Sequence, residues 1–244
     1  MSRIQRAVHA LQRSKPDPLT SLVLTMPVFL IYHLGILLID MRNGVDWVTE
    51  LTFRLLDASI PAYVAVTIGL SALLAGALWL LRRRGAVQPR ALLPVLGESF
   101  MWAVLMMFSV GAAVRNLTPA LRVLLDAAPG AAFEFGPLAK VVMAAGAGFH
   151  EEVAFRVLLF SGGARALAQL GMRPLAAFAL AALVSSLVFA FVHHLGVAGE
   201  TITLSAFSFR TLAGLYLCGL YAARGLAIAV YTHALYDALV FFVL

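Results

Sequence analysis

The sequence predicts an all-α fold, a polytopic transmembrane bundle of about seven helices, because its composition fits lipid rather than water as the solvent. Of the 244 residues, 62% are hydrophobic and 12% are charged, whereas an average soluble domain is roughly 45–50% apolar and about 25% charged. The mean hydropathy of +0.93 also excludes a disordered or nucleic-acid-binding chain, which would need more charge. The lipid bilayer is therefore an expected partner, and nucleic acid is not.

Apolar runs long enough to cross a bilayer define the expected helices. A spanning helix needs about 20 mostly apolar residues. Seven such runs occur, at 19–39, 60–81, 92–114, 138–160, 174–196, 204–223 and 226–244. The connections 40–59 and 115–137 mix apolar with charged residues, which favours interfacial amphipathic helices there. No repeat or polar linker divides the chain, so we expect one integral membrane domain over residues 1–244.

Lysine and arginine residues are distributed unevenly between alternate loops. If the N-terminus is cytoplasmic, the cytoplasmic side holds eleven of them and the opposite side four. Because cytoplasmic loops are enriched in these residues, we expect the N-terminus inside the cell and, after seven spans, the C-terminus outside. The net charge of +6 is interpreted as this orientation signal. The abundance of Ala, Leu and Arg suggests the cytoplasmic (inner) membrane of a bacterium.

Ionisable residues inside the apolar runs are costly in lipid and are therefore candidates for function. They gather in three of the predicted spans, as His150, Glu151, Glu152 and Arg156, then His193 and His194, then His233 and Asp237. Three others stand apart. His33 and Glu98 are interpreted as packing or hydrogen-bonding groups, whereas Arg210 either snorkels to the interface or pairs with a carboxylate.

The spacing within this group predicts how its members pair. Residues four apart share a helix face, and both Glu152 with Arg156 and His233 with Asp237 have that spacing. Glu151 would lie about 100° around an α-helix from Glu152. We therefore expect Glu152 and Arg156 to form a structural ion pair, which leaves Glu151 to face a cavity.

Carboxylates and imidazoles that share a dry cavity favour general acid–base chemistry, because a Glu and a His can hold and deprotonate one water. This arrangement is typical of a hydrolase. The metalloprotease pattern His-Glu-x-x-His is not met, since Ala154 stands where the second histidine belongs. Glu151, His193 and His233 are residue types that zinc accepts. The same set works without a metal, so no cofactor is expected.

Three patterns occur in order along the second half of the chain. Glu-Glu-x-x-x-Arg is formed by Glu151, Glu152 and Arg156, Phe-x-x-x-His by Phe189 and His193, and His-x-x-x-Asp by His233 and Asp237. Together they resemble the motif set of the CPBP family, intramembrane endopeptidases that include the type II CAAX prenyl proteases and the Abi and bacteriocin-processing proteins. The resemblance covers 138–244, which is the expected catalytic core. It selects His193 over His194, because Ala190 precedes His194 by four residues.

The resemblance implies a role for each motif residue. Glu151 would act as general base on a water that His193 also positions, and His233 and Asp237 would stabilise the oxyanion. Because an ionised carboxylate repels an oxyanion, Asp237 would act either in its protonated form or by orienting His233. Glu151 and His193 meet if the fourth helix is tilted, if that helix runs on through Leu170, or if the fifth helix starts later.

The leading hypothesis is an intramembrane endopeptidase that cleaves a membrane-associated protein or peptide near its C-terminus or in its leader. In CAAX-processing relatives the substrate is a prenylated tail. Two alternatives remain. A proton-coupled transporter also buries Glu, His and Arg on facing helices, but its halves usually repeat. A non-catalytic membrane scaffold could retain the motif without using it.

Overall fold

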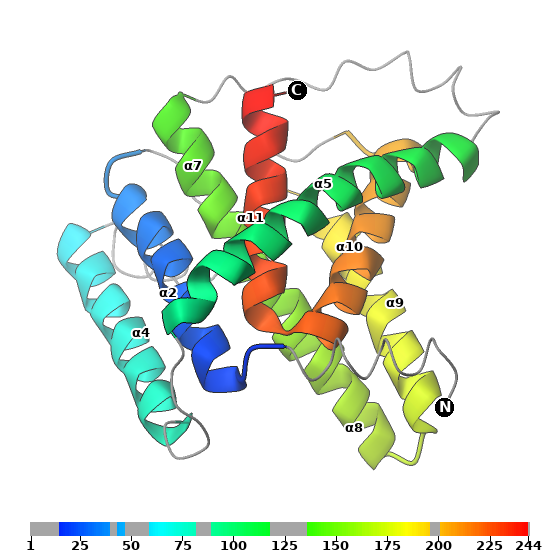
Figure 1. Cartoon of the computed structure of the whole chain (residues 1–244), viewed down its shortest axis with the longest axis horizontal. Helices are drawn as coiled ribbons and strands as arrows, with labels where there is room; N and C mark the ends of the chain where they lie inside the picture. The colour runs from blue at the N-terminus through cyan, green and yellow to red at the C-terminus, as the bar shows by residue number, and fades with distance from the viewer. Residues whose placement is uncertain are drawn as a thin grey trace.

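The computed structural model describes residues 15–39, 43–46, 59–81, 89–117, 136–195 and 201–243. These residues are helical and contain no strand, so the predicted fold class is confirmed. In chain order the elements are α2 (Pro18–Gly35), α4 (Ile60–Leu81), the short η1 (Pro89–Ala91), α5 (Leu92–Leu117), α7 (Pro137–Gly146), η3 (Ala147–Gly162), α8 (Gly163–Gln169), α9 (Pro174–Val192), α10 (Leu204–Arg224) and α11 (Leu226–Val243). Each predicted apolar run coincides with a helix or with consecutive helices (Figure 1).

Among the residues that the structure describes, five helices are long and apolar enough to cross a membrane, namely α2, α4, α5, α9 and α11. The two other predicted spans differ from these five. Helix α10 contains Arg210 and Arg224, and the predicted fourth span is divided between α7, η3 and α8. Both still pack within the bundle, α10 against α9, α11 and α5, and η3 against α11 and α9. The interfacial helices predicted at 40–59 and 115–137 lie largely outside the described residues.

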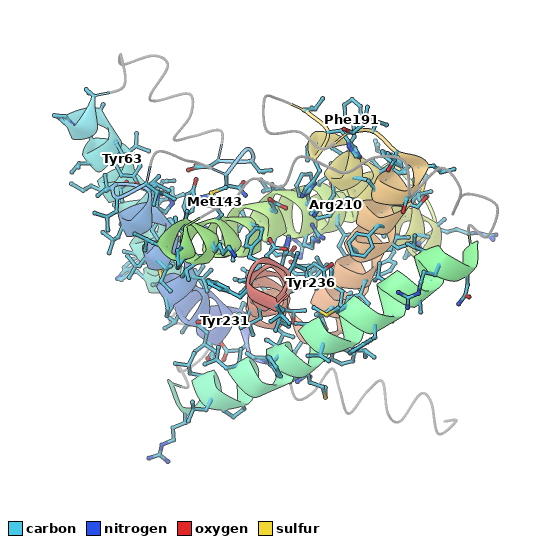
Figure 2. The ribbon with its side chains drawn as sticks, turned by 90° about the horizontal axis from the view of Figure 1, so that it is seen from above. Tyr63, Met143, Phe191, Arg210, Tyr231 and Tyr236 are labelled. Atoms are coloured by element: carbon cyan, nitrogen blue, oxygen red, sulfur yellow. The ribbon has the colours of Figure 1, made fainter. Side chains whose placement is uncertain are left out.

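Helix α11 forms the centre of the bundle (Figure 2, where it is seen end-on). It packs against α5, η3, α2, α7 and α10, and its residues from Ala227 to Val230 are fully buried. The Tyr231 hydroxyl donates to the Leu24 carbonyl of α2 at 2.7 Å. Contacts on every side therefore fix the rotation of α11, and with it the positions of His233 and Asp237.

The predicted fourth span is a continuous helical stretch from Pro137 to Gln169, but its middle part, η3, is π-helical. In a π-helix the backbone hydrogen bonds reach five residues along the chain, so the α-helical angle expected between neighbouring side chains is wrong here. Such segments are frequent at functional sites. The stretch ends with Leu170 as its cap, beyond the predicted end at residue 160, so that of the three alternatives the fourth helix does run on to Leu170. Helix α9 ends at Val192, earlier than predicted.

Glycine allows η3 to touch α11. A Cβ on Gly148 would lie 2.7 Å from the Ala234 Cβ and 2.8 Å from the Val230 carbonyl oxygen, closer than real Cβ contacts. The backbones of the two helices therefore meet at this point, shortly before Glu151 in the chain. The close approach brings the side chains of η3 within reach of those of α11.

We predict that Gly148→Ala lowers the free energy of unfolding by about 1–3 kcal/mol, because the added methyl group must push η3 away from α11. Chemical or thermal unfolding of the purified protein in detergent measures the change. Gly97→Ala in α5 is the matched control, since a Cβ there meets nothing within 4 Å. Equal stability of Gly148→Ala and the wild type would show that the helices do not meet at this glycine.

Candidate active site

The deepest part of the site is an ion pair that is shielded from solvent. The Arg156 Nε lies 3.1 Å from Glu152 Oε2, and both side chains are fully buried. The other oxygen of Glu152 lies 2.7 Å from His233 Nδ1 of α11. The Arg156 guanidinium also lies over the Phe189 ring, 4.5 Å from its centroid. The predicted ion pair is thus present, and Glu152 additionally links η3 to α11, which the spacing did not predict.

Glu151 lies beside this pair and faces different partners. Its Oε1 accepts a hydrogen bond from Asn43 Nδ2 at 2.9 Å. Its Oε2 lies 3.5 Å from His193 Nε2 and 3.9 Å from His233 Nε2, and it has no hydrogen-bond partner among the described residues. Helices η3, α9 and α11 therefore bring one carboxylate oxygen and two imidazoles together in a buried position.

The contacts of the two histidines decide which ring nitrogen carries the proton. His193 Nδ1 lies 2.7 Å from the Phe189 carbonyl oxygen, which can only accept, so Nδ1 is the donor. His233 Nδ1 likewise donates to Glu152, whose charge is balanced by Arg156. In the neutral form of each ring, the lone pair of Nε2 is consequently directed toward Glu151.

The site becomes more accessible to solvent with distance from the buried Glu152–Arg156 pair. The side chains of His193 and Asp237 are 17% and 16% exposed. Asp237 Oδ2 lies 3.8 Å from His233 Nε2, so the predicted His–Asp pair is brought together. The partly exposed Arg210 of α10 interacts electrostatically with Glu151, His193 and Asp237 (Figure 2). The sequence left Arg210 either to snorkel to the interface or to pair with a carboxylate, and the structure favours pairing with carboxylates.

The ionisable residues that the sequence set apart from the site have other partners. His33 Nδ1 lies 3.1 Å from the Tyr63 hydroxyl, and Glu98 forms an ion pair with Arg224 at 2.5 Å. Both therefore serve packing and hydrogen bonding, as predicted. His194 stacks on a phenylalanine ring of α10.

Asn43 is a site residue that sequence reasoning missed. It lies in a short loop that follows α2 after a few intervening residues, and its amide contacts Glu151 directly. The loop carries no periodicity that would single out one residue. The only available signal was a polar side chain that comes shortly after an apolar run.

Within the described parts of the chain, no group of three or more His, Cys, Asp or Glu side chains is arranged to hold a metal ion. Glu151 Oε2 lies 3.5 Å from His193 Nε2 and 3.9 Å from His233 Nε2, and these are residue types that zinc accepts. That the reaction needs no metal stays a prediction from the sequence.

The site thus contains a carboxylate and two imidazoles buried among apolar helices, and groups of these types can support general acid–base chemistry. Residues 134–239 match the family described as type II CAAX prenyl endopeptidase Rce1-like. The resemblance inferred from the three motifs is confirmed by this match, and the matched family is one of CAAX-type endopeptidases. No curated protein and no solved structure is significantly similar to the chain.

We predict that Arg156→Ala lowers the free energy of unfolding by about 3–5 kcal/mol, because it leaves Glu152 as a buried carboxylate without its cation. Unfolding in detergent again measures the loss. Arg165→Ala is the matched control on the same helical stretch, since Arg165 is exposed. If both variants were as stable as the wild type, the Glu152–Arg156 pair would have no structural role.

Proposed function

We propose that the chain is an intramembrane endopeptidase in which Glu151 activates the water that attacks a peptide bond. One observation carries the proposal. Glu151 Oε2 faces the Nε2 atoms of His193 and His233 at 3.5 and 3.9 Å, while its other oxygen is held by Asn43. The carboxylate is therefore buried, oriented and directed toward two imidazole nitrogens.

The attacking water would bind between Glu151 and His193. The carboxylate Oε2 of Glu151 and the neutral Nε2 of His193 are both acceptors. They therefore cannot hydrogen-bond to each other across the 3.5 Å that separates them. A water can donate one hydrogen to each and direct its lone pair toward the substrate carbonyl. As the new C–O bond forms, Glu151 takes a proton from the water. It then returns that proton to the leaving amine when the C–N bond breaks.

The oxyanion of the tetrahedral intermediate needs donors, and charge balance identifies one. If Glu151, Glu152 and Asp237 are all ionised, their three negative charges stand against two positive charges on Arg156 and Arg210. A second proton on His233 would neutralise the remaining charge, and Nε2 would then point a hydrogen toward the reacting carbonyl. Asp237, 3.8 Å from that nitrogen, would act indirectly by orienting and stabilising His233.

The proposed substrate is a membrane-associated protein or peptide that is cleaved near its C-terminus or in its leader. The description of the matched family names a CAAX prenyl endopeptidase, and a prenylated tail is one member of this substrate class. The proposed setting is the inner membrane of a bacterium with the N-terminus in the cytoplasm. The uneven distribution of Lys and Arg supports that orientation.

We predict that Glu151→Gln lowers the cleavage rate by at least about 10²-fold with folding intact, because the amide fills the same space but cannot take a proton. Quantitative mass spectrometry of membrane-protein termini compares cells that express the wild type or the variant at equal levels. New termini found only with the wild type identify the substrate and its cleavage site.

Glu98→Gln is the matched control for this experiment, since Glu98 pairs with Arg224 outside the site. Its terminus profile should equal that of the wild type. Identical profiles for the wild type and Glu151→Gln would contradict the proposal. Proton-driven flux that depends on Glu151 would then support a transporter.

We predict that Asp237→Asn keeps cleavage within about 10-fold of the wild-type rate, because asparagine retains the shape and can donate directly to an oxyanion. Asp237→Leu, which removes every polar atom, should lose most of the activity. The measurement is the initial rate of cleavage of the substrate found above. A complete loss in Asp237→Asn would show that the carboxylate itself takes part in proton transfer.

A further inference from the structure

We infer that Asn43 is a positioning residue for Glu151, so that the catalytic unit includes one residue from the N-terminal half of the chain. The loop lies outside residues 134–239, the segment matched by the family. This inference rests on the proposed role of Glu151 as general base. It adds a residue that acts through Glu151 and does not itself touch the substrate.

The amide of Asn43 has only one orientation that satisfies its neighbours. Its Oδ1 accepts a hydrogen bond from the Val45 backbone N–H at 2.8 Å, so its Nδ2 must be the atom that faces Glu151. An N–H donor and a carboxylate oxygen meet there at 2.9 Å in a buried position, where a charge-assisted hydrogen bond is strong. The opposite orientation would place two acceptors against each other.

The loop that presents this amide is fixed to α2. The Asn43 backbone N–H donates to the Tyr32 hydroxyl at 2.9 Å, and that hydroxyl donates to Asp46 Oδ2 at 3.0 Å. The Asp46 backbone N–H closes the turn on the Asn43 carbonyl at 3.1 Å. Tyr32, Asn43 and Asp46 are all buried. Because these contacts hold the Asn43 amide in place, the amide in turn restricts the orientation of the Glu151 carboxylate.

Helix η3 is held against the same tyrosine. A Cβ on Gly146, the last residue of α7 and the cap of η3, would lie 2.5 Å from a Tyr32 ring atom, so the backbone that leads into η3 is in direct contact with this ring of α2. On the next turn, His150 Nε2 lies 3.8 Å from Asp46 Oδ1. Tyr32 thus positions both the donor on Asn43 and the helix that carries Glu151.

The hydrogen bond makes the two oxygens of Glu151 different. Oε1 is occupied by Asn43, whereas Oε2 faces His193 and His233 and is the atom assigned to the water. Without the Asn43 donor, the carboxylate can rotate about its last side-chain bond, and fewer of its conformations place an oxygen opposite His193. The expected effect is a loss of turnover, because misplacement of a catalytic group by about 1 Å can cost roughly 10²-fold.

The experiment measures initial rates with the full-length protein in liposomes and a synthetic peptide that spans the cleavage site found by terminus profiling. Asn43→Ala should lower kcat by about 10–100-fold with KM and the unfolding midpoint within error of the wild type. Asn43→Asp should be slower than Asn43→Ala, because it keeps the acceptor for Val45 but sets a second carboxylate against Glu151. Gly44→Ala, exposed in the same loop, is the matched control with wild-type rates.

The possible failures differ from one another. A wild-type kcat in Asn43→Ala, with Glu151→Gln inactive, overturns the positioning role and leaves the proposed function in place. A raised KM or a lowered unfolding midpoint that accounts for the lost rate also overturns it, since Asn43 would then be structural. If the wild type produces no cleavage, or Glu151→Gln cleaves normally, the proposed function fails and the inference fails with it.

Discussion

The candidate site depends on the pairing of one fully buried carboxylate, Glu152. An unpaired ion away from water costs several kcal/mol or more, so both oxygens of this side chain need partners. Arg156 supplies one from the same helix, and His233 supplies the other from α11. Because the two partners come from different directions, they fix the rotation of η3 against α11. The adjacent Glu151 is consequently held away from the guanidinium and directed toward His193.

The sequence predicted the helices well because lipid leaves few alternatives. A backbone in the hydrocarbon core must satisfy its own hydrogen bonds, so long apolar runs such as 60–81 become helices. The π-helical geometry of η3 was not predictable in this way. It occurs where Gly148 brings η3 against α11, and a contact between distant segments leaves no mark in local periodicity. The end of α9 at Val192, earlier than predicted, likewise could not be read from local periodicity.

Part of the site was readable because it depends on local spacing. Residues four apart, such as Glu152 and Arg156, share a face by helical geometry alone, so the motif predicted their contact. The contact between Glu152 and His233 depends on the relative rotation of two helices and was missed. Asn43 lies 108 residues before Glu151 in a loop, and only the packing of α2 against α7 and η3 brings the two together.

Three carboxylates can coexist in this apolar bundle because each has its own compensation at its own depth. Glu152 is neutralised in the interior by Arg156 and needs no water. Asp237, near the exposed side, has His233 and Arg210 as its electrostatic partners. Glu151 lies between these two and has a fixed donor on one oxygen, while its other oxygen faces the Nε2 atoms of His193 and His233. A water entering from the exposed side would therefore find its best hydrogen-bonding position at Glu151, where the proposed reaction needs it.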